Sequence, residues 1–404
     1  MGLLAKKKAA IQKAKIEKTH EIVCLYCFRS FNHDQVKFRA KASLDDRGYE
    51  DMPDYPLDDY RARFYMGSLG DMPPALDPED FGEASKGHLR GILSSLKDAY
   101  GDVTSQRICP YCHNDISASA GFAPSTVISI VGASQSGKSV FLTSLIHTIK
   151  SVTSHNFDVF CAPLSGEMGR KFKFECEDPF IETGQILGHA QISRQQEPFV
   201  FTFSFADGTK PELSIAFFDV TADGVTDNAN MEIFASYVRN SSGVMFLVEP
   251  AQFRAIGLRL QNLNQANVAT TQDPAEVLSG MVEKYIYKQQ GGVSHIPTAV
   301  VLTKTDLLEA ISYEGDYIHP RSTVFTRFTH RTHLNMTQTD IVNYEIDEFI
   351  QRADPNFRNA LKRRFANLGL FGVSARNDIR VDEPFLWILY KLGYIDGFYE
   401  GAVL

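Results

Sequence analysis

A stretch in the first half of the chain has the residue types and spacing of a phosphate-binding loop. Residues 132–139 read Gly-Ala-Ser-Gln-Ser-Gly-Lys-Ser and match the pattern G-x-x-x-x-G-K-[ST]. Glycines allow backbone N–H groups to turn toward a phosphate, and the positive end of a helix dipole favours the anion. We expect Lys138 to reach the β- and γ-phosphates and Ser139 to hold Mg²⁺. The candidate phosphate-binding residues are Gly132, Ser134, Gln135, Ser136, Gly137, Lys138, Ser139 and Val140.

A carboxylate at the end of a second apolar run is the candidate for the other half of this site. Asp219 follows the run Leu213–Phe218, and a carboxylate there can hold Mg²⁺ directly or through water. A strand-end Asp that caps a turn is the alternative. No Glu follows Asp219 directly, which argues against the class of ATPases that places a catalytic Glu beside this Asp.

A third motif has the chemistry to recognise a base. Residues 303–306 read Thr-Lys-Thr-Asp and follow the apolar run Thr298–Leu302. The two oxygens of Asp306 can accept hydrogen bonds from the ring N–H and the amino group of guanine, whereas adenine would leave them unpaired. The stem of Lys304 can lie along the base, and a backbone N–H of residues 374–376 can meet the guanine carbonyl. The candidate base-binding residues are Thr303, Lys304, Asp306, Ser374, Ala375 and Arg376.

Four cysteines in two pairs have the spacing of metal ligands. Each pair is a C-x-x-C with an aromatic residue inside it, and residues 28–108 separate the two pairs. One such pair also fits a redox motif, but two indicate a tetrahedral Cys₄ zinc site with no open position, and therefore a structural metal. Disulfides or free thiols are the alternative, and His33 or His113 could replace one ligand. The candidate ligands are Cys24, Cys27, Cys109 and Cys112.

The elements that must position these motifs follow the pattern of an α/β domain. Residues 206–212, with Asp207 and Gly208 in the turn, connect the second strand candidate to the third, which predicts an antiparallel hairpin. The sequence therefore predicts a six-stranded mixed sheet flanked by helices. The strand candidates are Thr126–Val131, Phe199–Phe205, Leu213–Val220, Val244–Val248, Thr298–Thr303 and Leu370–Val373. The helix candidates are Val140–Lys150, a helix beginning at Asp273 and Pro274, Thr339–Gln351 and Glu383–Leu392.

The first 120 residues have a different character. Residues 1–20 hold six lysines and one acid and indicate a basic helix. Residues 44–83 hold twelve acids, three bases and five prolines and indicate an irregular acidic insertion anchored by aromatic side chains. A short helix is expected near Ala84–Tyr100. We expect a basic N-terminal helix at 1–20, a split zinc ribbon at 21–120 that contains the insertion, and a nucleotide-binding domain at 121–404.

Length and composition exclude several classes of protein. The chain has 404 residues, 44% of them hydrophobic and 22% charged, which is ordinary for a folded protein of two or three domains. No apolar run is long enough for a transmembrane helix, and the basic start lacks the apolar core of a signal peptide. We therefore expect a reducing, cytoplasmic location. The net charge is −8, and the acidic insertion alone carries −9, which disfavours nucleic acid as a partner.

The order of these motifs resembles that of the TRAFAC-class GTPases. The chain has G-x-x-x-x-G-K-S, an Asp after the second strand of a hairpin, T-K-x-D for the usual N-K-x-D and S-A-R for S-A-K. More narrowly, it is similar to bacterial GTPases with an N-terminal split zinc ribbon, among them the second type of double-GTPase protein proposed for bacterial conflict systems. The resemblance implies GTP or GDP, Mg²⁺ and Zn²⁺ as ligands, and a partner GTPase or GTPase-activating protein.

The chain departs from that family's pattern in its switch regions. Ala222 stands where the D-x-x-G motif has glycine, Gly224 follows two residues later, and no Gln is placed to orient the attacking water. Asp223 is the nearest substitute. Thr183 is the first candidate for the switch I threonine, with Ser193 as the alternative. The candidate catalytic residues are Lys138, Asp219, Asp223 and Thr183.

These features predict a GTP-binding switch with slow hydrolysis that a protein partner accelerates. The missing Gln and Ala222 also motivate a second hypothesis, a nucleotide-loaded scaffold that does not hydrolyse. A third hypothesis is a P-loop enzyme that uses ATP.

Overall fold

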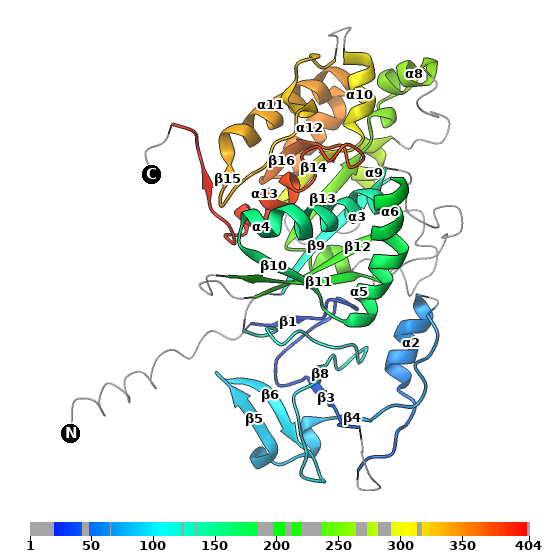
Figure 1. The fold of residues 1–404 in the computed structure, drawn as a ribbon, viewed down its shortest axis with the longest axis vertical. Coiled ribbons are helices and arrows are strands. Elements are labelled where there is room, and N and C mark those ends of the chain that lie inside the picture. Colours follow the sequence, from blue (N-terminus) through cyan, green and yellow to red (C-terminus); the bar gives the residue numbers. More distant parts are fainter. Residues whose placement is uncertain are drawn as a thin grey trace, which may run out of the picture. The chain divides into compact units, whose positions relative to one another are not determined.

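The chain forms two compact units, which are described separately. Unit 1 comprises Met1–Ser125 with Pro211–Ser214, and unit 2 comprises Thr126–Lys210 with Ile215–Leu404 (Figure 1). No helix in the described part of the chain is long and apolar enough to cross a membrane. The computed structural model describes residues 20–42, 48–64, 66–122, 125–133, 136–184, 197–206, 212–219, 236–263, 273–281, 292–312 and 317–401. The basic helix expected at the N-terminus lies outside them, except for its last residue.

Unit 1 is built from short antiparallel strands. They form the pair β1–β2 and two three-stranded sheets with the orders β4-β3-β8 and β5-β6-β7. Most of these strands have two or three residues, and the buried core of the unit includes Phe28, Phe38, Tyr60 and Leu96. The strands are β1 (Ile22–Val23), β2 (Ser30–Phe31), β3 (Lys37–Arg39), β4 (Ala75–Leu76), β5 (Lys86–Leu89), β6 (Ile92–Lys97), β7 (Val103–Thr104) and β8 (Arg107–Ile108).

The short helix expected near Ala84–Tyr100 is wrong, because this segment contains a β-hairpin. Strands β5 and β6 are antiparallel, and Leu89 pairs with Ile92 across a two-residue turn. Arg90 and Gly91 in that turn have φ angles of 50° and 85°. Two successive positive φ angles define the hairpin turn whose twist matches the flanking strands, and they cannot occur inside a right-handed helix.

The acidic insertion contains a regular helix, α2 (Tyr55–Arg63), where the sequence indicated irregular structure. Asp54 caps the helix by accepting a hydrogen bond from the N–H of Leu57 at 3.2 Å, and a proline lies in the first turn. Tyr60 is buried in unit 1, and its ring lies 6.0 Å from that of Tyr26 in the first cysteine pair. The aromatic anchoring of this segment is therefore seen directly at Tyr60.

Unit 2 is an α/β unit around a mixed sheet of seven strands, one more than the six predicted. The strand order is β10-β11-β12-β9-β13-β14-β16. Strands β9, β12, β13, β14 and β16 are parallel, and β10 is antiparallel to β11. Strand β12 lies beside β11, and the connection 206–212 is too short for a parallel crossover, so this pair forms the expected hairpin. The strands are β9 (Thr126–Gly132), β10 (Val159–Pro163), β11 (Phe199–Phe205), β12 (Leu213–Asp219), β13 (Gly243–Val248), β14 (Thr298–Leu302) and β16 (Leu368–Gly372).

The strand that the sequence did not predict is β10, at the edge of the sheet. It reads Val-Phe-Cys-Ala-Pro, and its side chains are half-buried or exposed, so it lacks the apolar run of a central strand. Pro163 is tolerated because an edge strand needs hydrogen bonds on one side only. The central strand β9, by contrast, is buried at every residue.

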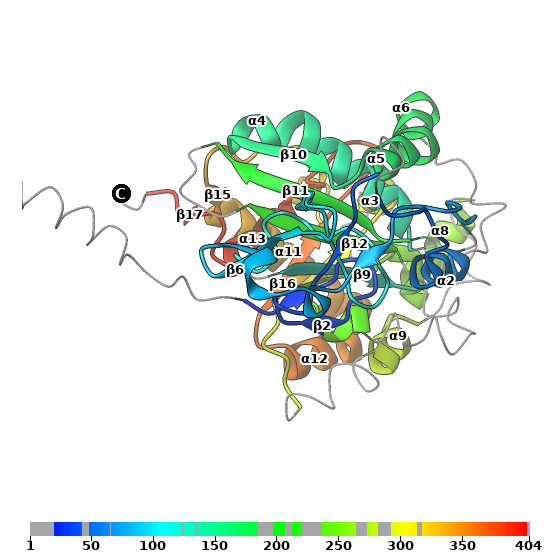
Figure 2. The same ribbon diagram turned by 90° about the horizontal axis from the view of Figure 1, so that it is seen from below.

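Helices cover both faces of this sheet (Figure 2). On one side, Phe172 of α5 packs on Phe199 and Phe201 of β11, with ring centroids 5.3 and 5.6 Å apart. On the other side, Phe357 of α12 packs against Phe246 of β13 at 6.2 Å. The α-helices and helical turns of unit 2 include α3 (Lys138–Thr148), η3 (Ile149–Thr153), α4 (Ser154–Asn156), α5 (Gly166–Phe172), η4 (Lys173–Glu177), α6 (Asp178–Thr183), η6 (Pro250–Gln252), α8 (Arg254–Asn262), α9 (Pro274–Met281), α10 (Thr305–Ser312), η9 (Thr323–Phe325), α11 (Met336–Ala353), α12 (Pro355–Arg364) and α13 (Glu383–Lys391). A separate pair of short strands joins β15 (Leu334–Asn335) to β17 (Gly397–Phe398).

The predicted helices are confirmed with small shifts of their ends. The helix expected at Thr339–Gln351 lies within α11, and the one expected at Glu383–Leu392 is α13, whose Trp387 is buried. Asp273 caps α9 as expected, because its Oδ1 accepts a hydrogen bond from the N–H of Ala275 at 2.7 Å. Capping and hydrophobic period are local signals, so the sequence carries them directly.

Candidate functional site

The predicted phosphate loop connects the central strand β9 to the N-terminus of α3, which begins at Lys138. Gly137 precedes the helix with φ of 81°, a left-handed conformation that favours glycine. Ser134 and Gln135, in the middle of the loop, lie outside the described residues. Strand, loop and helix therefore have the arrangement that directs the positive end of a helix dipole toward an anion.

Close packing at the start of the loop leaves room for glycine alone. A Cβ atom at Gly132 would lie 2.5 Å from the carbonyl oxygen of Leu247 in β13 and 2.9 Å from Oγ of Ser136. The hydroxyl of Ser136 is buried and has no hydrogen-bond partner in the described part of the chain. A phosphate fits these features, because it would bring acceptor oxygens to a loop that has an unsatisfied donor.

Lys138 lies folded over the loop. Its ammonium group donates to the carbonyl oxygens of Gly132 at 3.2 Å and Ala133 at 2.6 Å, and the residue is 4% exposed. Ser139, the next residue of α3, is half-buried. The ammonium group is thus held at the loop, where phosphate oxygens would be a further set of acceptors for it.

The backbone brings Asp219 to the same edge of the sheet. Asp219 is the last residue of β12 and lies opposite Ile130 of β9, two residues before the loop begins. Carboxyl ends of adjacent parallel strands meet at one edge, which is where open α/β sheets bind ligands. The position agrees with the predicted role in Mg²⁺ binding, which stays a prediction.

The switch candidates are only partly described. Thr183 is the exposed last residue of α6, and its hydroxyl donates to the carbonyl oxygen of Pro179 at 2.8 Å. Ser193, the alternative, and Asp223 lie outside the described residues, as do Ala222 and Gly224. The role of Thr183 as a switch residue stays a prediction.

The base-binding candidates lie against the phosphate loop. The hydroxyl of Thr303 donates to the carbonyl oxygen of Ser136 at 2.9 Å, although 167 residues separate them along the chain. Lys304 has φ of 52°, and its Cε lies 3.6 Å from the position that a Cβ atom at Gly137 would take. The phosphate loop and the segment 303–306 therefore form one continuous surface.

The remaining base-binding candidates, residues 374–376, follow β16 and contact residues 303–306 through Ser374. The hydroxyl of Ser374 donates to Oδ1 of Asp306 at 2.7 Å, and Ser374 is fully buried. The loop after it is closed by two hydrogen bonds between the backbones of Ser374 and Ile379, at 3.1 and 2.9 Å. Ala375 accepts a hydrogen bond on its carbonyl oxygen from Ser144 of α3 at 3.4 Å, whereas Arg376 is exposed. The structure thus brings residues 303–306 and 374–375 together.

One charged residue of this site was missed by the sequence reasoning. Glu249 follows β13 directly, is 7% exposed, and forms an ion pair with Lys304. The signal that points to it is the one used for Asp219, an acidic residue at the carboxyl end of a buried apolar strand. Glu249 belongs to no recognised motif, and its partner Lys304 lies 55 residues away along the chain.

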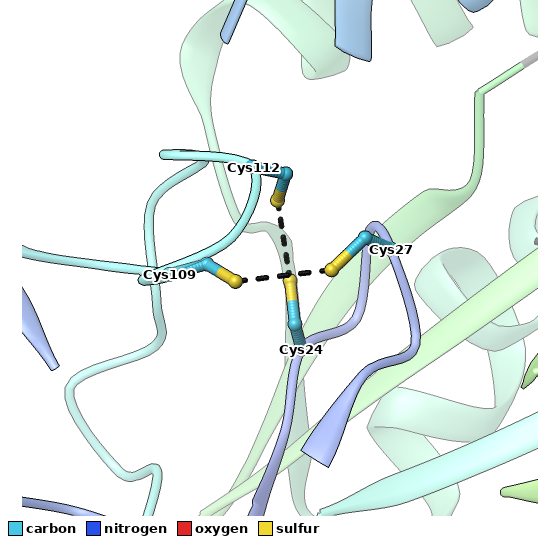
Figure 3. A group of neighbouring side chains, drawn as sticks. All are labelled: Cys24, Cys27, Cys109 and Cys112. Atoms are coloured by element: carbon cyan, nitrogen blue, oxygen red, sulfur yellow. Dashed lines mark hydrogen bonds between the residues drawn. The ribbon is translucent and has the colours of Figure 1, made fainter. Parts of the chain in front are cut away.

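The four predicted zinc ligands of unit 1 converge in one buried cluster (Figure 3). The Sγ atoms of Cys24 and Cys112 lie 3.7 Å apart, those of Cys27 and Cys109 lie 3.8 Å apart, and all four lie within 4.8 Å of one another. Sulfur atoms about 2.3 Å from a tetrahedral zinc ion are about 3.8 Å from one another. The cluster therefore fits a Cys₄ zinc site.

The two cysteine pairs share one backbone conformation. The N–H of Phe28 donates to the carbonyl oxygen of Cys24 at 2.8 Å, and the N–H of His113 donates to that of Cys109 at 3.0 Å. Both residues have positive φ, 56° and 53°. Cys109 also accepts a hydrogen bond on Sγ from the N–H of Tyr111 at 3.4 Å. Turns of this kind direct two sulfur atoms to one point and hydrogen-bond to their charge.

Burial and hydrogen bonds shift the pKa values of three of the four cysteine thiols in opposite directions. Burial raises the pKa of the Cys24 and Cys112 thiols well above the usual value, whereas hydrogen bonds from the neighbouring thiols, that of Cys109 first, lower the pKa of Cys27. Thiols that hold their protons must release them when a metal binds, so the affinity for zinc depends on pH.

His113 does not take part in the cluster. Its Nδ1 lies 2.7 Å from Oδ1 of Asp54, and the other oxygen of Asp54 pairs with Arg39 at 2.7 Å. Burial lowers the pKa of His113 despite the nearby carboxylate. Asp54 therefore links the cap of α2 to the residue that follows the fourth cysteine. Among the described residues, the cluster that could hold a metal contains the four cysteines without His33 or His113.

Comparison with known proteins gives a likeness in sequence and likenesses in structure. No known family profile matches the chain. The chain is 23% identical over 209 residues to a Mycolicibacterium smegmatis protein described as "Putative ESX-1 scaffolding and assembly protein SaeC". The match covers 50% of this chain and 52% of that protein, so the chain spans about half the length of this relative.

A solved structure is also similar, at a low level. It is the Arl6 BBS3 small GTPase from Trypanosoma brucei with the bound nucleotide analogue GppNp. The identity is 12%, the match covers 67% of this chain and 99% of that chain, and the TM-score is 0.31. A likeness of this size does not indicate a function for this chain.

Proposed function

We propose that unit 2 binds GTP and hydrolyses it slowly, as a molecular switch of the TRAFAC type. The observation that supports guanine over other bases is the hydrogen bond from Ser374 to Asp306, 2.7 Å long, beside the phosphate loop. Ser374 orients the carboxylate and uses one of its acceptor positions, and the remaining lone pairs can accept from the ring N–H and amino group of guanine. Adenine would leave these acceptors unpaired.

The other residues of the site would hold the phosphates. Lys138 and the loop amides would bind the β- and γ-phosphates, and Ser139 with Asp219 would hold Mg²⁺, which spreads the charge that develops on the phosphates. Water would attack the γ-phosphate in line. Because no Gln is placed to orient that water, we expect an intrinsic rate on the order of 10⁻³ s⁻¹ or lower and acceleration by a protein partner.

Base specificity is the sharpest test of this proposal. In a melting experiment we expect GDP to raise the melting temperature of the protein and ADP to leave it unchanged, because a ligand stabilises only the state that binds it. Asp306→Asn should lose the response to GDP and gain one to xanthosine diphosphate, since the amide N–H can donate to the carbonyl that xanthine has in place of the amino group. Asp340→Asn, an exposed change on α11, is the control. An equal response to ADP would exclude the proposed role of Asp306.

A second function is favoured by the match to the scaffolding protein and by Ala222 in the switch region. We propose it as the alternative, a nucleotide-loaded scaffold that does not hydrolyse. Single-turnover release of phosphate with Mg²⁺ separates the two functions. Release above the Lys138→Ala background would exclude the pure scaffold, and a rate of about 1 s⁻¹ or more would remove the need for an activating partner.

For unit 1 we propose a structural zinc ion in the cysteine cluster and a role in choosing a protein partner. The closed set of four sulfur ligands supports the first proposal, and the charge of the acidic insertion supports the second. A place in a bacterial conflict system rests on the family resemblance. A pull-down that compares the protein loaded with a GTP analogue and with GDP tests for a partner. If that partner still binds after deletion of residues 44–83, the proposed role of unit 1 in choosing it is wrong.

A further inference from the structure

The side chain of Glu249 lies where three strands of unit 2 end beside the phosphate loop. Glu249 follows β13, whose neighbours in the sheet are β9, which leads into the loop, and β14, which leads into residues 303–306. Its own backbone is fixed, because its N–H donates to Oε1 of Gln252 at 2.8 Å and Pro250 begins the next helical turn. A cation close by stabilises a buried carboxylate of this kind.

That cation is Lys304, which belongs to the proposed base-binding motif. The ammonium group of Lys304 contacts Oε2 of Glu249, and the adjacent Cε lies 3.6 Å from the position that a Cβ atom at Gly137 of the phosphate loop would take. The side chain of Lys304 is 40% exposed and that of Glu249 is 10% exposed. The ion pair therefore draws the charged end of Lys304 toward β13 and leaves part of its stem at the surface.

We propose that Glu249 is a positioning residue for the guanine nucleotide, an inference that rests on the proposed function. By holding the ammonium group of Lys304, it keeps the apolar stem across Gly137 as a wall for the base and ribose. Without Glu249, the charged end of Lys304 would move into solvent, as long charged side chains do, and the stem would leave with it. The phosphates contact Lys138 and the loop instead, so Glu249 acts on the nucleoside part of the ligand.

The test compares a ligand that has a base with one that has none. Binding of GDP and of inorganic tripolyphosphate is measured by calorimetry for the wild type and for Glu249→Gln. We expect Glu249→Gln to weaken GDP about tenfold, the effect of one lost charge-assisted hydrogen bond. The affinity for tripolyphosphate should stay the same within about twofold, because Lys138 and the loop are unchanged.

A second variant separates positioning from folding. Lys304→Met alone leaves the carboxylate of Glu249 buried without a cation, so its melting temperature should fall. In Glu249→Gln with Lys304→Met, no charge remains to pull the side chain into solvent. The double variant should therefore regain the melting temperature and bind GDP more tightly than Glu249→Gln does.

Two results would overturn the inference. One is wild-type affinity for GDP in Glu249→Gln, and the other is an equal loss for GDP and tripolyphosphate, which would mean a general structural role. If the wild type binds tripolyphosphate but does not prefer GDP over ADP, the proposed function is wrong, and the proposed role of Glu249 is wrong with it. If the wild type binds GDP selectively and Glu249→Gln does so equally well, the inference about Glu249 fails alone.

Discussion

The cysteine cluster of unit 1 and the nucleotide site of unit 2 both gather residues from distant parts of the chain, but they do so by different means. In unit 2, five parallel strands end at one edge and bring the loops together, and buried aromatic side chains hold the sheet to its helices. In unit 1, most strands have two or three residues, and the four cysteines converge from two turns. The site of unit 2 is thus a product of its core, whereas we expect the fold of unit 1 to depend on the zinc ion proposed for its cysteine cluster.

Removal of zinc should have the largest effect and tests this difference directly. We expect metal analysis to find about one zinc per chain, and chelation to unfold unit 1, because structural zinc contributes about 10 kcal/mol to folding. Hydrogen exchange should rise throughout residues 20–122 and stay unchanged in β9, β13 and β14. Cys109→Ser should reproduce this effect and Cys161→Ser, outside the cluster, should not. A metal-free chain with a protected unit 1 would remove the contrast between the two units.

The second prediction concerns the core on which unit 2 depends. Glu383 accepts hydrogen bonds from Arg380 at 2.9 Å and Thr339 at 3.1 Å, and both charged side chains are 1% exposed. Glu383→Gln should lower the free energy of unfolding by about 3 kcal/mol, because Arg380 would be left buried without its counter-charge. Chemical denaturation followed in unit 2 measures this loss, and the zinc content should not change.

The matched control for Glu383 is an exposed ion pair on α11. Glu348 and Arg352 lie 3.4 Å apart with 39% and 46% of their side chains exposed. Glu348→Gln should cost less than about 0.5 kcal/mol, since exposed pairs of this spacing contribute little. Equal losses for the two variants would show that burial does not determine the effect.

The third prediction concerns binding at the phosphate loop. Lys138→Ala should weaken GTP about 100-fold, because it removes charge-assisted hydrogen bonds to the phosphates worth about 3 kcal/mol. Lys173→Ala, which removes an exposed ion pair with Asp178, is the control and should bind as the wild type does. The comparison is sharpened if protein that has been stripped of zinc and returned to buffer with Mg²⁺ keeps its affinity for GTP. Loss of GTP binding in that protein would instead make the nucleotide site dependent on unit 1.

The smallest expected effect is on the pH dependence of unit 2. Hydrogen bonds from Arg358, 2.7 Å long at its Nε, and from Lys362 lower the pKa of Asp347. A lowered pKa stabilises the folded state above the pKa of the unfolded chain, near 4, and this contribution disappears as the pH falls through the folded value. Asp347→Asn should therefore lower stability by less than about 1 kcal/mol at pH 7, and the difference should shrink as the pH falls below about 4. A difference that persists at low pH would contradict this account.

Prediction from the sequence succeeded where the signal is local. The alternation and length of apolar runs located six strands of the large sheet, and Asp273 with Pro274 located the start of α9. The sequence does not predict β10, because an exposed edge strand needs no apolar run. It predicts a helix in place of the hairpin β5–β6, because Arg90 in the turn adopts a conformation that its residue type rarely takes. In both cases the tertiary context determined the backbone more strongly than composition did.

The sequence by itself determined the chemical groups of both candidate sites. The glycines and Lys138 of the phosphate loop, Asp306 and the four cysteines are each recognisable within a few neighbouring residues, because their function depends on local spacing. Only the tertiary structure decided how these groups are oriented. Ser374 reaches Asp306, Glu249 reaches Lys304, and Asp54 joins α2 to His113, the residue after the fourth cysteine, across separations of 68, 55 and 59 residues. In unit 2 the order of strands in the sheet sets such contacts, and the pattern of apolar residues along the chain carries no record of that order.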